Sequence, residues 1–191
     1  MDSTCVRTAL QDTNSRKSGF KKIFSCVAPS RSGELEFAVQ LIPEGVLSPK
    51  LWRLEKGEML ELYGPLGTNF VWEASMGEGV VLLGAGSGIT PLLSICMAHR
   101  ETYGDTACSF IMSAKSPEKL AYMKSIRDVV QARFTQSDGR IDREFLEARL
   151  AGVSRNSLCF VCGPDGFIDA MVDMLLDLGF GEDCIRSERF T

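Results

Sequence analysis

The sequence has few of the residues that bind metals or build disulfide frameworks. Its 191 residues include a single histidine, His99, and seven cysteines, an odd number without two closely spaced CxxC clusters. A zinc site or a plant-type iron–sulfur cluster needs more ligands in close spacing, and a small secreted scaffold needs an even set of cysteines. We therefore expect a reducing compartment, no metal site, and an organic cofactor for any redox chemistry.

Excess positive charge and long apolar runs are also missing. Lys+Arg 21 against Asp+Glu 25 gives a net charge of −4, which argues against the basic surface that nucleic-acid binding requires. The longest apolar runs, Gly79 to Ala85 and Ile89 to Ala98, fall short of the roughly 20 residues of a membrane span. The first 22 residues lack the apolar core of a signal peptide. We expect no nucleic-acid partner, no membrane span, and a cytoplasmic location with the mitochondrion as the alternative.

The chain contains two regions with different sequence patterns. After a poorly patterned segment, 1–19, residues 20–77 contain short strands and turns, and the strand expected at 34–41 alternates strictly between polar and apolar residues. This pattern predicts part of an antiparallel sheet or barrel. In residues 78–191 strands alternate with helices, which indicates parallel strands joined by helical crossovers and hence a doubly wound α/β domain. The expected strands are 21–27, 34–41, 59–63, 80–85, 107–113, 133–136, 157–162 and 185–189, and the expected helices are 91–101, 117–131, 142–150 and 164–178.

The most informative segment joins the strand expected at 80–85 to a helix through three glycines spaced two apart. It reads Gly84-Ala85-Gly86-Ser87-Gly88-Ile89-Thr90-Pro91, with Thr90 placed to cap the helix and Pro91 at its first position. Glycines let phosphates approach main-chain N–H groups, and a helix N-terminus attracts anions. The segment predicts a nucleotide-phosphate loop. Because the spacing departs from G-x-G-x-x-G, a purely structural turn is the alternative.

A second loop, Cys162-Gly163-Pro164, ends a later strand of the same expected sheet. The carboxyl edge of an open α/β sheet is where ligands bind, so both loops should face one site. Cys159 and Cys162 lie three residues apart on a strand and must point to opposite faces. This geometry disfavours a redox-active dithiol, and we assign Cys159 to the core.

Four further segments, in order and spacing, make residues 20 to 191 resemble the ferredoxin-NADP reductase-like superfamily of flavin reductases. Lys22-Ile23-Phe24-Ser25 stands where that superfamily has Arg-x-Tyr-Ser, and Gly45-Val46-Leu47-Ser48 is similar to its Gly-x-x-Ser/Thr turn on the flavin pyrophosphate. Gly64-Pro65-Leu66-Gly67 resembles the turn that leads out of the flavin barrel. Ser187-Glu188-Arg189-Phe190-Thr191 resembles the terminal strand with its carboxylate and aromatic residue.

The resemblance implies a partial FAD-binding barrel followed by an NAD(P)-binding α/β domain. Hydride would pass from nicotinamide C4 to flavin N5, and electrons would leave to an external protein or small-molecule acceptor. Lys22, Phe24 and Ser25 would contact FAD, with Ser25 near N5. Cys162 would lie beside the nicotinamide, Glu188 would connect the site to solvent protons, and Phe190 would cover a ring face. The protein then mainly positions its cofactors.

Three departures from the superfamily pattern favour alternatives to a reductase. Lys22 replaces an arginine that could bind phosphate bidentately, and Phe24 replaces a tyrosine and loses its hydroxyl donor. Few residues precede Lys22, so barrel strands present in the superfamily have no counterpart here. The alternatives are a non-catalytic nucleotide-binding module and an electron-transfer subunit whose partner completes an incomplete flavin site.

The nucleotide preference is predicted from the end of the second parallel strand. Ser113, Lys115 and Ser116 offer donors there, and no carboxylate follows before Glu118. A carboxylate would bind the ribose hydroxyls of NADH, whereas a basic residue would bind the 2′-phosphate of NADPH. The segment therefore favours NADPH over NADH, with an ordinary surface charge as the alternative interpretation of Lys115.

Overall fold

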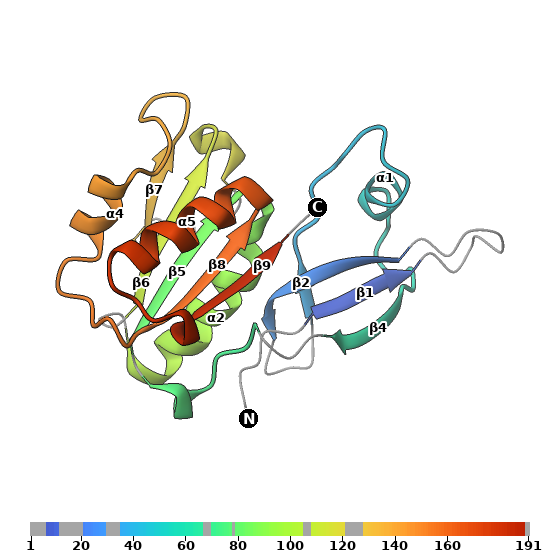
Figure 1. Ribbon diagram of the computed structural model, residues 1–191. Helices are drawn as coiled ribbons and strands as arrows, with labels where there is room; N and C mark the ends of the chain where they lie inside the picture. Colours follow the sequence, from blue (N-terminus) through green and yellow to red (C-terminus); the bar gives the residue numbers. More distant parts are fainter. Residues whose placement is uncertain are drawn as a thin grey trace.

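A computed structural model describes residues 7–11, 21–29, 35–66, 70–77, 79–104, 108–120 and 128–189. Within these ranges the chain forms an antiparallel sheet of four strands and a parallel sheet of five strands (Figure 1). The antiparallel sheet has the order β3-β2-β1-β4 and the parallel sheet the order β7-β6-β5-β8-β9. The change of sequence pattern near residue 78 thus separates two sheets of different type.

The antiparallel sheet is built around β1, which pairs with both β2 and β4. Its strands are β1 (Arg7–Gln11), β2 (Lys21–Pro29), β3 (Leu35–Phe37) and β4 (Glu61–Leu66). The strand expected at 21–27 is confirmed and extends to Pro29, and the one expected at 34–41 is shorter. Strand β1 lies inside the segment that sequence analysis left without a pattern, because so short a strand is defined by its neighbours rather than by its own periodicity.

The expected Gly64-Pro65-Leu66-Gly67 turn is wrong in its first three residues, which belong to β4. Strand β4 is the last strand in the order of the sheet and pairs with β1. An edge strand tolerates proline, because one side of its backbone has no ladder hydrogen bond to lose. Gly67 lies outside the described residues.

The parallel sheet confirms the predicted α/β domain. Its strands are β5 (Val80–Ala85), β6 (Cys108–Ala114), β7 (Val130–Phe134), β8 (Leu158–Gly163) and β9 (Ile185–Arg189). Neighbouring strands are all parallel. The chain winds outward from β5 in both directions, so the crevice between β5 and β8 is the position where such sheets bind ligands.

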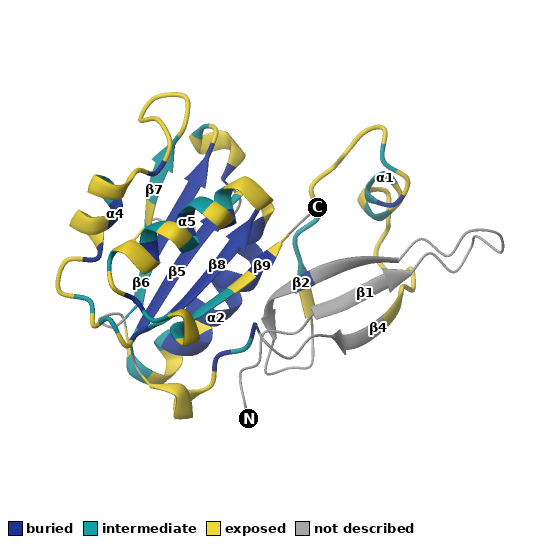
Figure 2. Cartoon of the chain, in the orientation of Figure 1, coloured by how far each residue is buried: buried dark blue, intermediate teal, exposed yellow. Residues whose placement is uncertain are grey.

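Helices cover both faces of this sheet (Figures 1 and 2). Helix α2 (Ile89–Tyr103) packs on one face, with Val80, Leu82, Phe110 and Phe160 in a single buried cluster. Helices α4 (Arg143–Arg149) and α5 (Asp165–Asp177) pack on the other face, where a second cluster contains Val81, Leu83, Ile111 and Val161. Burial on both faces explains why the central strand β5 is continuously apolar.

The helix expected at 117–131 is wrong in the described part of that range. Pro117–Lys119 form a short 3₁₀ turn, and β7 begins at Val130. Val129 and Val130 are β-branched residues that favour a strand, and Val130 pairs with Phe110 of β6. The end of the predicted helix is therefore an edge strand of the sheet, because it pairs with β6.

The segment Phe70–Met76 leads from the antiparallel sheet toward β5. Phe70 and Trp72 are buried in the cluster beneath α2, and the segment ends in a 3₁₀ turn, η1 (Ala74–Met76). Strand β2 contacts α2 directly. Among the described residues, none of the helices combines the length and apolar character that a bilayer crossing requires.

Candidate functional site

The glycine loop lies at the carboxyl end of β5, as predicted. Gly86–Gly88 form a 3₁₀ turn, η2, and α2 begins directly afterwards at Ile89. The residue before the helix is therefore Gly88, and the prediction of Thr90 as the N-cap is wrong. Thr90 lies inside the first turn, where its hydroxyl donates to the Ser87 carbonyl over 3.2 Å. The helix starts earlier because the glycine turn itself leads into helical backbone.

Pro91 is the third helical residue rather than the first. Its missing N–H still costs no hydrogen bond, because the first backbone N–H groups of a helix have no partner within it. The first turn of α2 is buried, including Thr90 and Pro91. The loop that precedes the helix, rather than the helix side chains, thus offers accessible backbone at this edge.

The three glycines have different structural roles. A Cβ atom on Gly84 would lie 2.7 Å from Leu92 Cδ1 and against the sulfur of Met112, so Gly84 allows close packing of α2 on the sheet. A Cβ on Gly88 would lie 2.6 Å from the carbonyl carbon of Cys162 and against its oxygen. Gly86 has a φ of +56° and open space where its Cβ would stand. Gly86 is the loop glycine whose surroundings leave room for a ligand.

The contact at Gly88 joins the two predicted loops. Strand β8 ends at Gly163, and Pro164 precedes α5. In the sheet register, Gly84 of β5 lies beside Cys162, and Cys162 lies beside Glu188 of β9. The structure therefore brings these predicted residues together at one carboxyl edge, and in Figure 1 the ends of β5, β8 and β9 point toward the antiparallel sheet.

Cys159 and Cys162 occupy opposite faces of the sheet, as their spacing predicted. Cys162 is buried in the cluster beneath α2, whereas Cys159 is buried in the cluster beneath α4 and α5. Burial raises the pKa of the Cys159 thiol to about 12, with a further contribution from the neighbouring Cys184. A thiol with so high a pKa is protonated and unreactive at neutral pH, so Cys159 is a core residue.

Glu188 is a buried carboxylate, with 7% of its surface exposed, near the end of β9. Acidic side chains are rarely so buried without a functional or structural reason. The next residue, Arg189, is exposed and forms ion pairs with Asp169 at 2.7 Å and Asp165 at 3.2 Å on α5. These pairs fix the end of β9 against α5. Phe190 lies outside the described residues.

Ser25 is the residue of the Lys22–Ser25 motif whose side chain the structure describes. It is 3% exposed, and its hydroxyl has no hydrogen-bond partner among the described residues. Buried hydroxyl groups nearly always have a partner, so this group suits a hydrogen bond to a bound molecule. Lys22 and Phe24 lie on β2, and their side chains are outside the described residues.

The predicted pyrophosphate turn, Gly45 to Ser48, leads into a short helix, α1 (Ser48–Trp52). The Ser48 hydroxyl accepts from the Ile42 N–H at 3.0 Å and donates to the Ile42 carbonyl at 3.3 Å. Gly45 also packs closely on Ile42. Of the two residues between, Leu47 is buried and Val46 is half exposed. The turn is therefore ordered by its own hydrogen bonds.

The predicted nucleotide-preference residues lie at the end of β6, beside the glycine loop. Ser113 is buried and pairs in register with Ala85, whereas Lys115 is exposed. Glu118 has a pKa below its usual value, chiefly because Ser116 donates a hydrogen bond to it. Ser113 and Lys115 are thus placed at the expected edge.

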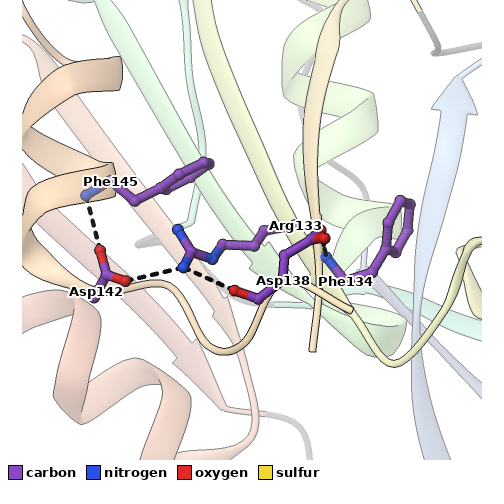
Figure 3. Close-up of polar contacts among 5 residues, drawn as sticks. All are labelled: Arg133, Phe134, Asp138, Asp142 and Phe145. Carbon is purple, nitrogen blue, oxygen red and sulfur yellow. Dashed lines mark hydrogen bonds and ion pairs between the residues drawn. The ribbon is translucent and has the colours of Figure 1, made fainter. Parts of the chain in front are cut away.

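Arg133 is a second cation at this edge, which sequence analysis missed (Figure 3). Its Nη2 donates to the Asp138 carbonyl and to an Asp142 carboxylate oxygen, each at 2.9 Å, and its guanidinium lies over the Phe145 ring. Asp142 also caps α4 by accepting from the Phe145 N–H. Arg133 therefore holds the turn after β7 together through its Nη2 atom.

Among the described residues, no group of three or more His, Cys, Asp and Glu side chains is arranged to hold a metal ion. The polar groups at the carboxyl edge include the exposed backbone of Gly86 and Ser87, the buried Glu188 carboxylate, the Ser113 hydroxyl and the Lys115 ammonium. Such a set suits an organic ligand with phosphates rather than a cation.

Curated proteins with similar sequences are NADH-cytochrome b5 reductases. NADH-cytochrome b5 reductase 2 of Meyerozyma guilliermondii is 26% identical over 158 residues, which are 74% of this chain and 53% of the relative. Cytochrome b5 reductase 4 of Mus musculus is 29% identical over 168 residues, 78% of this chain and 32% of the relative. The chain thus spans about half the length, or less, of these relatives. No protein-family model matches the chain.

Solved structures with the same fold include several reductases. A ferredoxin NADP+ reductase from Neisseria gonorrhoeae with bound FAD and NADP aligns with a TM-score of 0.78 at 22% identity, over 98% of this chain and 85% of that one. The cytochrome P450 reductase GcoB of Amycolatopsis aligns with a TM-score of 0.80 at 18% identity, over 98% of this chain and 60% of that one. The predicted resemblance to ferredoxin-NADP reductase-like proteins is thus confirmed at the level of the fold.

Proposed function

We propose that this chain, which has the fold of the ferredoxin-NADP reductase-like superfamily and sequence similarity to NADH-cytochrome b5 reductases, is an FAD-dependent NAD(P)H oxidoreductase that delivers electrons to an external acceptor. The observation that carries the proposal is the carboxyl edge of the parallel sheet. There the glycine loop packs on Cys162, and Cys162 pairs in register with the buried carboxylate of Glu188.

The glycine loop would bind the pyrophosphate of the nicotinamide nucleotide. Gly86 and Ser87 are exposed, and the positive φ of Gly86 turns the backbone at this point. Helix α2 has 15 residues and follows directly, so its N-terminus favours negative charge beside the loop. Thr90 stiffens the turn by its hydrogen bond to the Ser87 carbonyl. Ser113 and Lys115 lie at the neighbouring strand end and would meet the ribose.

The catalytic groups would be Ser25, Cys162 and Glu188. Bound FAD would supply the two-electron chemistry by accepting hydride from the nicotinamide. The side chain of Cys162 is completely buried at the sheet edge and would pack beside the nicotinamide. The carboxylate of Glu188, on the neighbouring strand, would hold and exchange a proton. The Ser25 hydroxyl, buried without a partner among the described residues, would donate or accept a hydrogen bond at the flavin.

The flavin would be held by the antiparallel half of the chain. The unpartnered Ser25 hydroxyl on β2 fits this role, because a bound group would satisfy it. Lys22 and Phe24 on the same strand would add a charge and a ring, and the turn from Gly45 to Ser48 would offer backbone N–H groups to the flavin pyrophosphate. This half would then act as a partial FAD-binding barrel.

The acceptor is proposed to be a haem protein of the cytochrome b5 type, since the sequence relatives are named for that acceptor. The Meyerozyma guilliermondii relative is also named for NADH, whereas Lys115 and the absence of a carboxylate before Glu118 favour NADPH. Both nucleotides belong in any test. We further propose a cytoplasmic location, or alternatively a mitochondrial one.

The test is the visible absorption spectrum of the purified chain after incubation with FAD and desalting, repeated anaerobically with NADPH and with NADH. We expect retained flavin that bleaches on addition of nucleotide. Glu188→Gln should bleach about 100-fold more slowly, because a positioned negative charge that stabilises the positive charge developing on the nicotinamide contributes about 10²-fold or more. Glu182→Gln, in the exposed turn before β9, is the matched control and should bleach at the unaltered rate.

A non-catalytic nucleotide-binding module, or a subunit whose flavin site a partner completes, is the second candidate. It is favoured by large apolar side chains exposed in the antiparallel half, including Trp52 at 64% and Met59 at 92%. A colourless protein that binds nucleotide in calorimetry would support this candidate and contradict the reductase. Native mass measurement of the assembly separates its two forms, because a completing partner adds mass.

A further inference from the structure

We infer that Arg186 is a positioning residue, which holds the connection between the two sheets beside the catalytic edge and thereby sets where Ser25 stands relative to Cys162 and Glu188. The expected effect on catalysis rests on the proposed function. The structural claim, that Arg186 holds the segment Phe70–Met76, depends only on the contacts described below. No sequence motif pointed to this residue.

Arg186 reaches from β9 to the connecting segment. Its Nη1 donates to the Val71 carbonyl at 2.7 Å and lies 3.7 Å from the sulfur of Met76. Its guanidinium lies 5.7 Å from the centre of the Phe160 ring on the neighbouring strand. A charged donor to a backbone carbonyl is among the stronger hydrogen bonds, and the side chain is half-buried. One side chain therefore joins β9, β8 and the connecting segment.

The same segment is attached at its other residues to the core of the α/β domain. Phe70 packs edge-on against Phe160, with ring centres 5.2 Å apart. Trp72 packs against His99 and Tyr103 of α2, and the Tyr103 hydroxyl donates to the Ala74 carbonyl at 2.9 Å. Arg186 supplies the hydrogen bond at Val71, between these two aromatic contacts.

Arg186 lies two residues before Glu188 of the proposed catalytic pair on β9. In the β8–β9 register Phe160 pairs with Arg186, and Cys162 pairs with Glu188 two residues farther along each strand. Residues two apart on a strand share a face and are separated by roughly 7 Å. Arg186 therefore lies on the same face of β8 and β9 as the proposed catalytic pair, Cys162 and Glu188.

The connecting segment links Arg186 to the antiparallel sheet. It follows β4, β4 pairs with β1, and β1 pairs with β2, where Ser25 pairs with Arg7. Because β2 also contacts α2 directly, a shift of the segment would change how the antiparallel sheet sits on α2, while the glycine loop between β5 and α2 would stay in place. Misplacement of reacting groups by about 1 Å can cost roughly 100-fold in rate.

The first readout is the accessibility of Trp72, which needs no cofactor. The chain has two tryptophans, and Trp52→Phe removes the exposed one, so that fluorescence reports on Trp72 alone. In this background Arg186→Met should raise the acrylamide quenching constant of Trp72 at least twofold. Arg186→Lys keeps a donor for Val71 and should raise it less. Arg143→Met, which removes an exposed ion pair with Asp177 on α4 and α5, should leave quenching unchanged.

The second readout is the anaerobic rate of flavin bleaching in FAD-loaded protein at saturating nucleotide. Arg186→Met should lower this limiting rate about 10- to 100-fold while the nucleotide dissociation constant stays within about twofold, and Arg186→Lys should recover part of the rate. If Arg186→Met does not fold, Arg186→Lys carries both readouts, with a smaller change in each. Unchanged quenching, or increased quenching with an unchanged rate, would overturn the inference. Wild-type protein that bleaches no flavin would instead contradict the proposed function, and the quenching alone would then decide whether Arg186 holds the segment.

Discussion

The parallel sheet and the antiparallel half of the chain differ in how much apolar surface the chain itself covers. Val81, Leu82 and Leu83 in β5 are completely buried between two layers of helices. In residues 35–62, by contrast, Leu47 is the buried apolar side chain among those described, and Met59 is 92% exposed. The parallel sheet is thus covered by the chain's own helices, whereas residues 35–62 leave large apolar side chains exposed.

The largest effect should come from comparing one leucine in each half. Leu83→Ala should lower the free energy of unfolding by about 2–5 kcal/mol, because a completely buried leucine leaves a cavity. Leu62→Ala in β4, where the side chain is 42% exposed, should cost about 0.5 kcal/mol. Denaturant unfolding of the two variants measures both values. Equal losses would show that the antiparallel half is as well packed as the parallel sheet.

A smaller effect should separate two glycines of the same loop. Gly88→Ala places a methyl group against the Cys162 carbonyl and should cost about 1–3 kcal/mol by overpacking, with weaker nucleotide binding. Gly86→Ala meets no atoms but must keep a positive φ, which costs about 1 kcal/mol. Thermal unfolding and calorimetric nucleotide titration test both. A Gly88→Ala protein with unaltered nucleotide affinity would contradict the role of the contact between the two loops.

Ser25→Ala should change the free energy of unfolding still less, so its effect on the flavin reaction tests the proposed role of the antiparallel half. Its hydroxyl has no partner among the described residues, so its removal should shift the free energy of unfolding by no more than about 0.5 kcal/mol. The rate of flavin bleaching by nucleotide should fall about tenfold, since one hydrogen bond to a cofactor is lost. A loss of stability without a change in rate would reassign Ser25 to the protein core.

The smallest effect concerns pH at the turn after β7. The Phe134 N–H donates to Asp138 over 2.9 Å and holds the pKa of Asp138 below its usual 3.8. A carboxyl group with a lowered folded pKa stabilises the fold above its unfolded pKa, and this contribution disappears as pH falls through the folded pKa. The amide proton shift of Phe134 should therefore titrate with a midpoint below 3.8. The titration should vanish in Asp138→Asn.

Much of the nucleotide half could be predicted from the sequence, because its signals are local. The strand at 80–85 and the strand at 185–189 match their predicted bounds, and the separation of Cys159 from Cys162 follows from the period of a strand. The same reasoning failed where pairing with another strand determined the local structure. Residues near Val130 form a strand because β6 pairs with them.

The separate roles of the three loop glycines could not be predicted, because spacing alone does not tell what a glycine approaches. Gly84 packs on Leu92, Gly88 packs on Cys162, and Gly86 turns the backbone. Arg133 and Arg186 were missed for a related reason. Each is one of many charged residues in the sequence, and its partners lie on other elements.

The sequence by itself determined the α/β pattern, the position of the glycine loop and the strand faces of its cysteines, because these depend on periodicity and on residues adjacent in the chain. The tertiary structure alone decided that Cys162 and Glu188 stand side by side and that Arg186 grips the segment leading from the antiparallel sheet. Strand register and long-range side-chain contacts depend on how separate elements pack together, and local patterns do not encode that packing.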